Sequence, residues 1–210
     1  GAYGQEIAGS IARVTAIDRI EERVVVLKAA ECRFGYRQSR FKGHDRDRFI
    51  VTHVSFLLRR ETPTVVYADV AEYLDRAKIA DPGVADVRKA VLAIRRGKGM
   101  VLDLRDTDTR SVGSFFMNPV ITEAAHAELD RQVSLKGEHT PGFRLGNGQV
   151  KVPAAWLIER AGFPKGYSRG AAGISSKHPL ALINRGGASA REIIELAVEI
   201  KQRVANAFGI

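Results

Sequence analysis

The apolar and polar positions of two stretches near the start of the chain have the pattern of β-strands. In the first, largely β-branched residues at 14–17 and 24–27 stand on either side of a polar reversal over residues 18–22, which predicts a β-hairpin. In the second, residues 48–58 alternate between two faces and predict a further strand. The amino-terminal part is therefore expected to contain antiparallel strands.

Apolar residues at helical spacing predict four helices further on, over residues 84–96, 122–133, 153–161 and 189–208. The last helix is the clearest, because Ser189 and Glu192 have the spacing of a capping box and an apolar stripe continues to Phe208. A strand is expected just before it, over residues 180–183. Separate runs of strands and helices predict an α+β fold.

A polar segment over residues 103–110 follows the first of these helices and is interpreted as a linker. At 210 residues, the chain is long enough for one large domain or two small ones. We therefore place a domain boundary at this linker, with one domain over residues 1–110 and a second over residues 111–210.

The composition is that of an ordinary globular protein, with 45% hydrophobic and 27% charged residues. The single cysteine, Cys32, excludes an intramolecular disulfide framework and favours a reducing cytoplasm. No run approaches the roughly 20 apolar residues that a membrane helix needs. The net charge of +9 favours anionic partners, namely phosphorylated cofactors, nucleotide sugars or nucleic acid. The basic residues are spread along the chain, which argues against a dedicated nucleic-acid module.

The most specific candidate chemistry lies in the apolar run over residues 111–119. Gly113 allows the backbone to approach a ligand or to adopt a conformation that a Cβ would forbid, and it stands directly before Ser114. A serine in such a place can donate a proton if a neighbour changes its pKa or stabilises the charge that it leaves. Asn118 adds a donor and an acceptor one residue before a proline. The alternative is an ordinary turn serine before a buried strand.

Two glycine-rich cationic loops are candidates for binding an anion. Residues 97–99 enclose Lys98, and residues 165–173 combine Lys165 and Arg169 with small residues whose backbone amides suit a phosphate or diphosphate. The second loop lacks the spacing of a Walker loop or a dinucleotide fingerprint, so on its own it is a weak signal. Solvated loop cations are the alternative.

The sequence Ser-Phe-Phe-Met-Asn-Pro over residues 114–119, after a glycine, resembles a signature of the UDP-N-acetylenolpyruvoylglucosamine reductase family. Other segments resemble that family in the same order along the chain: residues 1–6 its flavin-contacting loop, 31–42 its active-site arginine segment, and 154–159 and 182–184 its substrate-domain elements. The resemblance covers nearly the whole chain.

The resemblance implies an oxidoreductase that uses NADPH and FAD to reduce UDP-N-acetylglucosamine enolpyruvate to UDP-N-acetylmuramate in peptidoglycan precursor synthesis. Residues 1–110 are then the carboxyl-terminal part of an FAD-binding region, and residues 111–210 a smaller α+β domain that binds the UDP-sugar. The family's amino-terminal FAD-binding subdomain and carboxyl-terminal strand, with its catalytic carboxylate, are then missing, so this chain is expected to be inactive alone. A cytoplasmic monomer that binds no nucleic acid is expected.

The same resemblance assigns roles to single residues. Ser114 is implied as the proton donor, and Arg37 as the residue that stabilises an enolate-like intermediate. The implied cofactor-binding residues are Gly1, Ala2, Tyr3, Gly4 and Tyr36, and the implied substrate-binding residues are Tyr67, Lys98, Asn118, Lys151, Lys165, Arg169 and His178. Phe143 departs from the family, which commonly has a tyrosine there; no metal site is expected. A non-catalytic nucleotide-sugar-binding or nucleic-acid-binding domain is the alternative.

Overall fold

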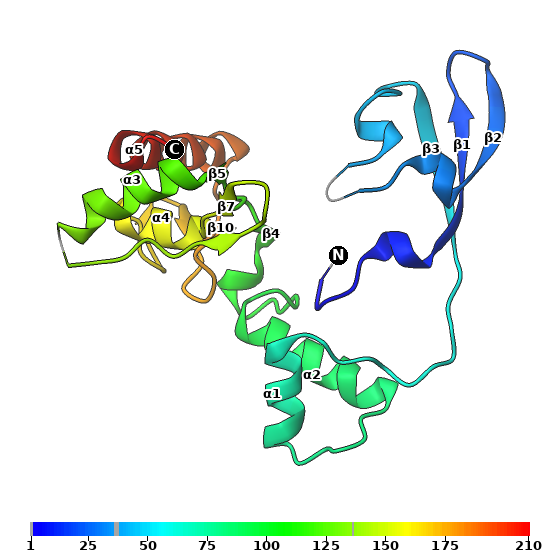
Figure 1. Cartoon of the computed structure of the whole chain (residues 1–210), viewed down its shortest axis with the longest axis horizontal. Coiled ribbons are helices and arrows are strands. Elements are labelled where there is room, and N and C mark those ends of the chain that lie inside the picture. Colours follow the sequence, from blue (N-terminus) through cyan, green and yellow to red (C-terminus); the bar gives the residue numbers. More distant parts are fainter. Residues whose placement is uncertain (1, 36–37, 136) are drawn as a thin grey trace. The chain divides into compact units, whose positions relative to one another are not determined.

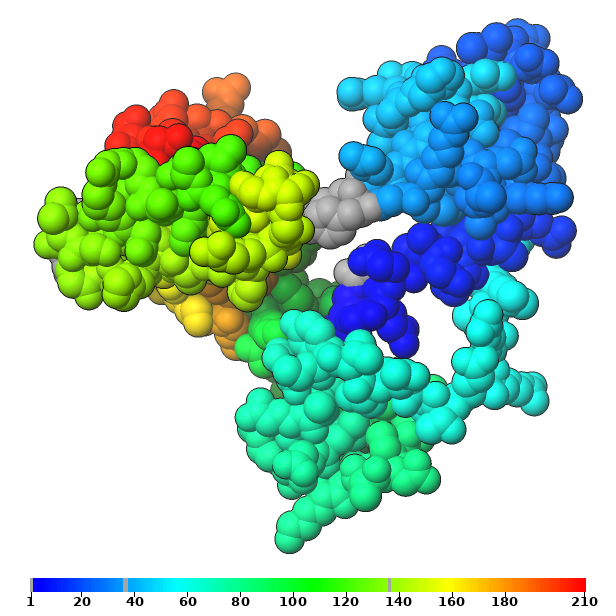
Figure 2. Space-filling model, viewed as in Figure 1, coloured from blue at the N-terminus to red at the C-terminus, as the bar shows by residue number. Residues whose placement is uncertain are grey.

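A computed structural model describes residues 2–35, 38–135 and 137–210 (Figure 1). The chain forms two compact units that divide between Val91 and Leu92, and each is described by itself. In the space-filling view of Figure 2, the strands of the first unit are blue and the second unit runs from green to red. None of the helices in the described ranges is long and apolar enough to cross a membrane. The functional boundary near residue 110 stays a prediction, and the compact units divide earlier.

The sheet of the first unit is built from the predicted hairpin and the strand predicted after it. It contains β1 (Ile11–Asp18), β2 (Arg23–Lys28) and β3 (Phe49–Phe56). The strands are antiparallel and lie in the order β2-β1-β3. Val14, Leu27 and Cys32 form its buried core, and two phenylalanines pack against them. The predicted antiparallel strands are therefore present.

A buried carboxylate holds the turn of this hairpin. Asp18 is 2% exposed, and its Oδ2 accepts a hydrogen bond of 2.6 Å from Nη2 of Arg48. Its Oδ1 accepts another, of 3.0 Å, from the backbone N–H of Ile20. The hydrogen bond from Arg48 lowers the pKa of Asp18 from its usual 3.8 to about 2. The pair therefore ties the end of β1 to the residue that precedes β3 over a wide range of pH.

Two helices follow the sheet, α1 (Ala68–Arg76) and α2 (Val84–Gly97). Short 3₁₀ helices lie at Ile7–Ser10, Ala29–Cys32, Arg40–Lys42 and Thr107–Thr109, the last labelled η4. α2 ends at a left-handed glycine, Gly99, whose N–H donates to the carbonyl of Arg96 at 3.0 Å. The N–H of Met100 donates to the carbonyl of Arg95 at 2.8 Å. This Schellman arrangement satisfies the last carbonyls of the helix, so Lys98 stands in an ordered helix end.

Two antiparallel sheets and three helices make up most of the second unit. The larger sheet has the order β4-β10-β9-β8 and contains β4 (Ser111–Ser114), β8 (Ser168–Arg169), β9 (Ala172–Ile174) and β10 (Ala181–Asn184). The smaller has the order β5-β7-β6 and contains β5 (Val120–Thr122), β6 (Phe143–Arg144) and β7 (Gln149–Lys151). The helices are α3 (Glu123–Ser134), α4 (Ala154–Arg160) and α5 (Ala190–Phe208). The α+β prediction is confirmed.

Helix α5 packs against the larger sheet and closes the core of the second unit. Leu196 of this helix shares one buried cluster with Ile174 of β9 and Leu182 of β10. The predicted capping box fixes where the helix starts. The N–H of Glu192 donates to Oγ of Ser189 at 3.3 Å, and the N–H of Ser189 donates to Oε2 of Glu192 at 2.8 Å.

Candidate functional site

Ser114 lies at the end of β4, beside the turn that leads into β10. The two strands are antiparallel, with Ser114 opposite Ala181, and the N–H of Phe115 donates to the carbonyl of Leu180 at 2.7 Å. This pairing places the Ser114 hydroxyl against the side chain of His178. Oγ of Ser114 and Nε2 of His178 are 2.8 Å apart, which is hydrogen-bond distance.

His178 is half-buried, and its surroundings favour the neutral form of its ring. Burial lowers the pKa of the imidazole below its usual 6.5, and the positive charges of Lys98 and Lys165 lower it further. A neutral imidazole has one N–H and one acceptor nitrogen, so it can donate to Oγ of Ser114 or accept its proton. Four residues predicted separately therefore come together, and Ser114, His178, Lys98 and Lys165 are called the Ser114 site below.

A buried carboxylate, which the sequence interpretation missed, holds the turn that carries His178. Asp108 is 7% exposed and accepts hydrogen bonds from the N–H of Ser176 at 2.8 Å and from its hydroxyl at 2.6 Å. Burial raises the pKa of Asp108, but hydrogen bonds from Ser176 and Ser175 outweigh it and leave the pKa below its usual value. Asp108 of the predicted linker thus packs against the second unit, and the domain boundary placed at that linker stays a prediction. The available signal was the run Asp-Thr-Asp-Thr, which is typical of a capped turn.

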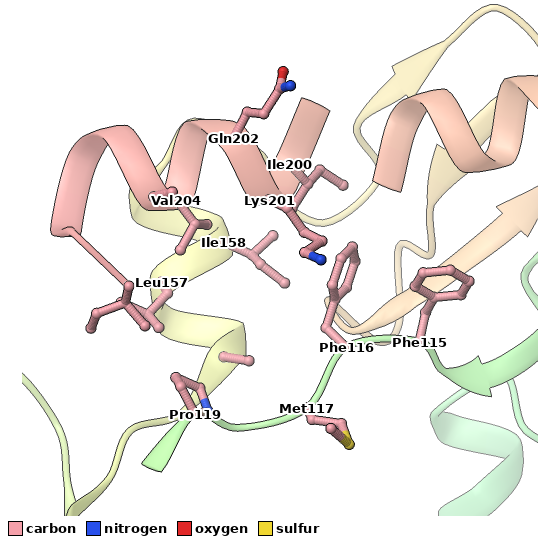
Figure 3. A pocket seen from close by; sticks show the side chains of 13 residues that line it. Phe115, Phe116, Met117, Pro119, Leu157, Ile158, Ile200, Lys201, Gln202 and Val204 are labelled. Carbon is pink, nitrogen blue, oxygen red and sulfur yellow. The ribbon is translucent and has the colours of Figure 1, made fainter. Parts of the chain in front are cut away.

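An apolar pocket opens on the residues that follow Ser114 (Figure 3). It has a volume of about 610 Å³ and is lined by Phe115, Phe116, Met117 and Pro119 and by side chains of α4 and α5. The rings of Phe115 and Phe116 are arranged edge to face, with their centres 5.3 Å apart, and Phe116 packs against the buried core. The Ser114 hydroxyl faces His178 instead. The two phenylalanines therefore support the segment that carries Ser114.

Three other predicted substrate-binding residues of this unit have partners within the chain. Oδ1 of Asn118 accepts a hydrogen bond of 2.9 Å from the N–H of Ala154, the first residue of α4. Nζ of Lys151 lies 5.8 Å from the ring centre of Phe143 on the neighbouring strand. The guanidinium of Arg169 pairs with two carboxylates of α5, at 3.5 and 3.4 Å. These contacts position the three side chains, and their predicted roles toward a substrate stay predictions.

The predicted cofactor-binding loop of the first unit is a tight turn. Ala2 and Gln5 exchange two backbone hydrogen bonds, of 2.9 and 3.1 Å, and Tyr3 and Gly4 between them are left-handed. A Cβ at Gly4 would lie 2.2 Å from the side chain of a neighbouring valine, so only glycine fits there. The ring of Tyr3 meets that of Tyr67 edge to face at 5.2 Å. Tyr3, a predicted cofactor-binding residue, therefore lies beside Tyr67, a predicted substrate-binding residue.

Gly1, Tyr36 and Arg37 lie outside the described residues, so the roles predicted for them stay predictions. Gly35 and Gln38, which flank Tyr36 and Arg37 in the sequence, exchange two backbone hydrogen bonds of 3.0 Å. Within the three described ranges, no group of three His, Cys, Asp or Glu side chains is placed to hold a metal ion.

The comparison with protein families identifies the second unit. The family model described as UDP-N-acetylenolpyruvoylglucosamine reductase, C-terminal domain, matches residues 105–210. The chain belongs to the UDP-N-acetylenolpyruvoylglucosamine reductase family. Curated reductases of this name match the whole chain: that of Thermobifida fusca is 50% identical over 215 residues, and that of Streptomyces avermitilis 44% over 221 residues. The chain spans 60% and 59% of their lengths.

A solved reductase shares the fold. The crystal structure of UDP-N-acetylenolpyruvylglucosamine reductase from Thermus caldophilus matches 96% of this chain and 52% of that chain, with a TM-score of 0.54 and 22% identity. At this identity the likeness concerns the fold alone, and it agrees with the α+β architecture. The family that the signature motifs indicated is thus confirmed.

Proposed function

We propose that this chain is part of a reductase that converts UDP-N-acetylglucosamine enolpyruvate to UDP-N-acetylmuramate in peptidoglycan precursor synthesis, using NADPH and FAD. Membership of the reductase family supports the reaction class. The observation that carries the proposal is the Ser114 site, where a hydroxyl, a neutral imidazole and two lysines meet.

The reaction adds a hydride to one carbon of a double bond and a proton to the neighbouring carbon. A bound flavin would supply the hydride. Ser114 supplies the proton from its hydroxyl, and the alkoxide that remains needs stabilisation because serine is a weak acid. The positive charges of Lys98 and Lys165 disfavour a proton on His178. For the same Coulombic reason they favour negative charge on the adjacent Oγ of Ser114.

One feature of the first unit fits a flavin. The ring of Tyr3 supports that of Tyr67 edge to face, and Tyr67 is 37% exposed, so its ring is available to a planar ring system. The net charge of the whole chain, +9, favours the diphosphate of such a cofactor. Ala2 and Gly4 remain the predicted residues of the contact loop.

The substrate carries a diphosphate and a carboxylate, which need cations or hydrogen-bond donors. Lys98 and Lys165 supply positive charge at the Ser114 site. Lys151, Arg169 and Asn118 are the further predicted contacts to the UDP-sugar. A cytoplasmic location and a monomeric state are also predictions.

The first test is a calorimetric titration of the 210-residue chain with the enolpyruvyl UDP-sugar at two salt concentrations. Saturable one-to-one binding is expected, because the Ser114 site lies within the second unit. A folded chain that ignores the UDP-sugar but binds an oligonucleotide, with an affinity that falls steeply with salt, would favour the nucleic-acid alternative.

The second test is Ser114→Ala in a complete reductase that contains this chain. Loss of the proton donor is expected to lower turnover of the UDP-sugar by about 100-fold or more, while NADPH oxidation coupled to flavin reduction continues. Ser111→Ala is the matched control, because Ser111 lies on the same strand and its Oγ accepts a local hydrogen bond of 3.2 Å from the N–H of Gly113. Unchanged turnover in Ser114→Ala would remove this residue as the proton donor.

A further inference from the structure

We propose that Asp108 is a positioning residue that holds both the turn carrying His178 and the helix end carrying Lys98 in place around Ser114. Its consequence for catalysis rests on the proposed function, whereas its effect on the geometry of the site does not. No role was predicted for Asp108 from the sequence, and three sets of contacts support one.

The first contacts join Asp108 to the turn over residues 175–178. Both oxygens of the carboxylate are engaged by Ser176, Oδ1 by its N–H at 2.8 Å and Oδ2 by its hydroxyl at 2.6 Å. The hydroxyl of Ser175 also lies near enough to Asp108 to lower its pKa. Because a carboxylate only accepts and this one is 7% exposed, it requires such donors from the turn.

The second contacts lead from that turn to the reacting hydroxyl. Ser175 is 1% exposed, and its Oγ accepts hydrogen bonds from the N–H of Lys177 at 3.0 Å and from that of His178 at 3.1 Å. The ring of His178 then meets Oγ of Ser114 at 2.8 Å. Asp108 therefore connects to Ser114 through the hydrogen bonds of Ser176, the peptide bond between Ser176 and Ser175, and the hydrogen bonds of His178.

The third contact joins Asp108 to the helix end that carries Lys98. A Cβ at Gly99 would lie 3.1 Å from Cβ of Asp108 and 3.2 Å from its backbone oxygen. The turn that follows Lys98 therefore packs directly on Asp108. One buried residue contacts both the segment that places the imidazole and the segment that places a positive charge.

Asp106 provides a matched control two residues away. Its Oδ1 accepts a hydrogen bond of 3.1 Å from the N–H of Asp108, and its Oδ2 pairs with Lys177. Asp106→Asn removes the same charge as Asp108→Asn and keeps an oxygen that can accept the capping bond. It removes the ion pair with Lys177 but leaves intact the hydrogen bonds that Ser176 of the turn donates to Asp108.

The decisive experiment follows the His178 ring by NMR in the 210-residue chain, as a pH titration of its ring nitrogens and carbons. In Asp108→Asn we expect the ring to lose its fixed contact with Ser114 and to titrate at higher pH than in the unsubstituted chain. Asp106→Asn is expected to leave the ring signals and their contact with Ser114 unchanged. If Asp108→Asn does not fold, Ser176→Ala can replace it, because it removes the hydroxyl that donates to Oδ2 of Asp108. This variant is also expected to raise the pH at which His178 titrates. A folded variant of either kind with an unchanged His178 titration overturns the proposal.

Turnover in a complete reductase that contains this chain supplies the second readout. Asp108→Asn is expected to lower kcat by about 10- to 100-fold, with a smaller change in KM, because a displaced catalytic group costs rate more than binding. Asp106→Asn should stay close to the unsubstituted enzyme. An Asp108→Asn enzyme with unchanged kcat, beside an inactive Ser114→Ala enzyme, would overturn the positioning role and leave the proposed function standing. An active Ser114→Ala enzyme would instead remove the proposed function, and the NMR titration would still decide the role of Asp108.

Discussion

The two glycines on either side of Lys98 should respond in opposite directions to the same substitution. Gly99 has a φ of +66°, which an L-residue adopts only under strain, and its missing Cβ faces the backbone of Asp108 at 3.2 Å. Gly97 is the last residue of α2, and among the described residues no atom beyond its own helix and chain neighbours lies within 4 Å of the position where a Cβ would stand. Alanine is therefore strained at Gly99 and unstrained at Gly97.

The magnitudes follow from these conformations. An alanine in the left-handed conformation costs about 1–2 kcal/mol, and crowding against Asp108 adds to this cost. Alanine also restricts the unfolded chain more than glycine does, which favours the folded state by about 0.4–1 kcal/mol and offsets part of the cost. Gly99→Ala should thus lower the free energy of unfolding by about 1–2 kcal/mol. Gly97→Ala should raise it by about 0.5–1 kcal/mol, because glycine is unfavourable in a helix. The two variants should differ by about 2 kcal/mol.

Urea unfolding followed by tryptophan fluorescence can measure this difference. Trp156 is the single tryptophan of the chain and lies in α4, so its signal reports on the second unit. The midpoint is expected to fall in Gly99→Ala and to rise in Gly97→Ala. A Gly99→Ala chain as stable as the unsubstituted one would refute the reasoning from conformation and close approach. Equal decreases in the stability of the two variants would also refute this reasoning, since of these two glycines only Gly99 is left-handed.

Two further predictions concern the capping box and the hairpin. Ser189→Ala removes the oxygen that accepts the N–H of Glu192 at 3.3 Å and should lower the free energy of unfolding of the second unit by about 1 kcal/mol; an unchanged Trp156 unfolding midpoint would contradict this. Asp18 has a folded pKa of about 2, below its usual 3.8, so its pairing with Arg48 stabilises the first unit above about pH 4 and is lost as the pH falls toward 2. Asp18→Asn should weaken the dependence of the stability of the first unit on pH between about 4 and 2, which can be followed through the amide signals of β1. A variant whose stability falls with pH as steeply as that of the unsubstituted chain would contradict this prediction.

Local patterns in the sequence were enough to predict most of the elements. The strands of the hairpin, the strand before α5 and the helices after residue 120 all lie where alternation, helical spacing and caps place them. Ser189 and Glu192 show why: they are three residues apart, so the capping box is complete within one turn of helix. Such signals need no information from elsewhere in the chain.

The candidate site was predictable only as separate residues. Ser114, Lys98, Lys165 and His178 each carry suitable chemistry, and the reductase signature drew attention to them. Nothing in the local sequence shows that Ser114 and His178, 64 residues apart, share a hydrogen bond. Likewise, a polar run gave no sign that Asp108 would be buried against Ser176, 68 residues away.

Sequence alone thus determined the elements and the kinds of side chain that this reductase-family chain can use, because periodicity, capping and residue chemistry are local properties. The tertiary structure decided which of those side chains meet. The antiparallel pairing of β4 with β10 sets Ser114 opposite Ala181 and so beside the turn of His178. The burial of Asp108 then decides how that turn is held, since a carboxylate removed from water must find donors on whatever segment packs against it.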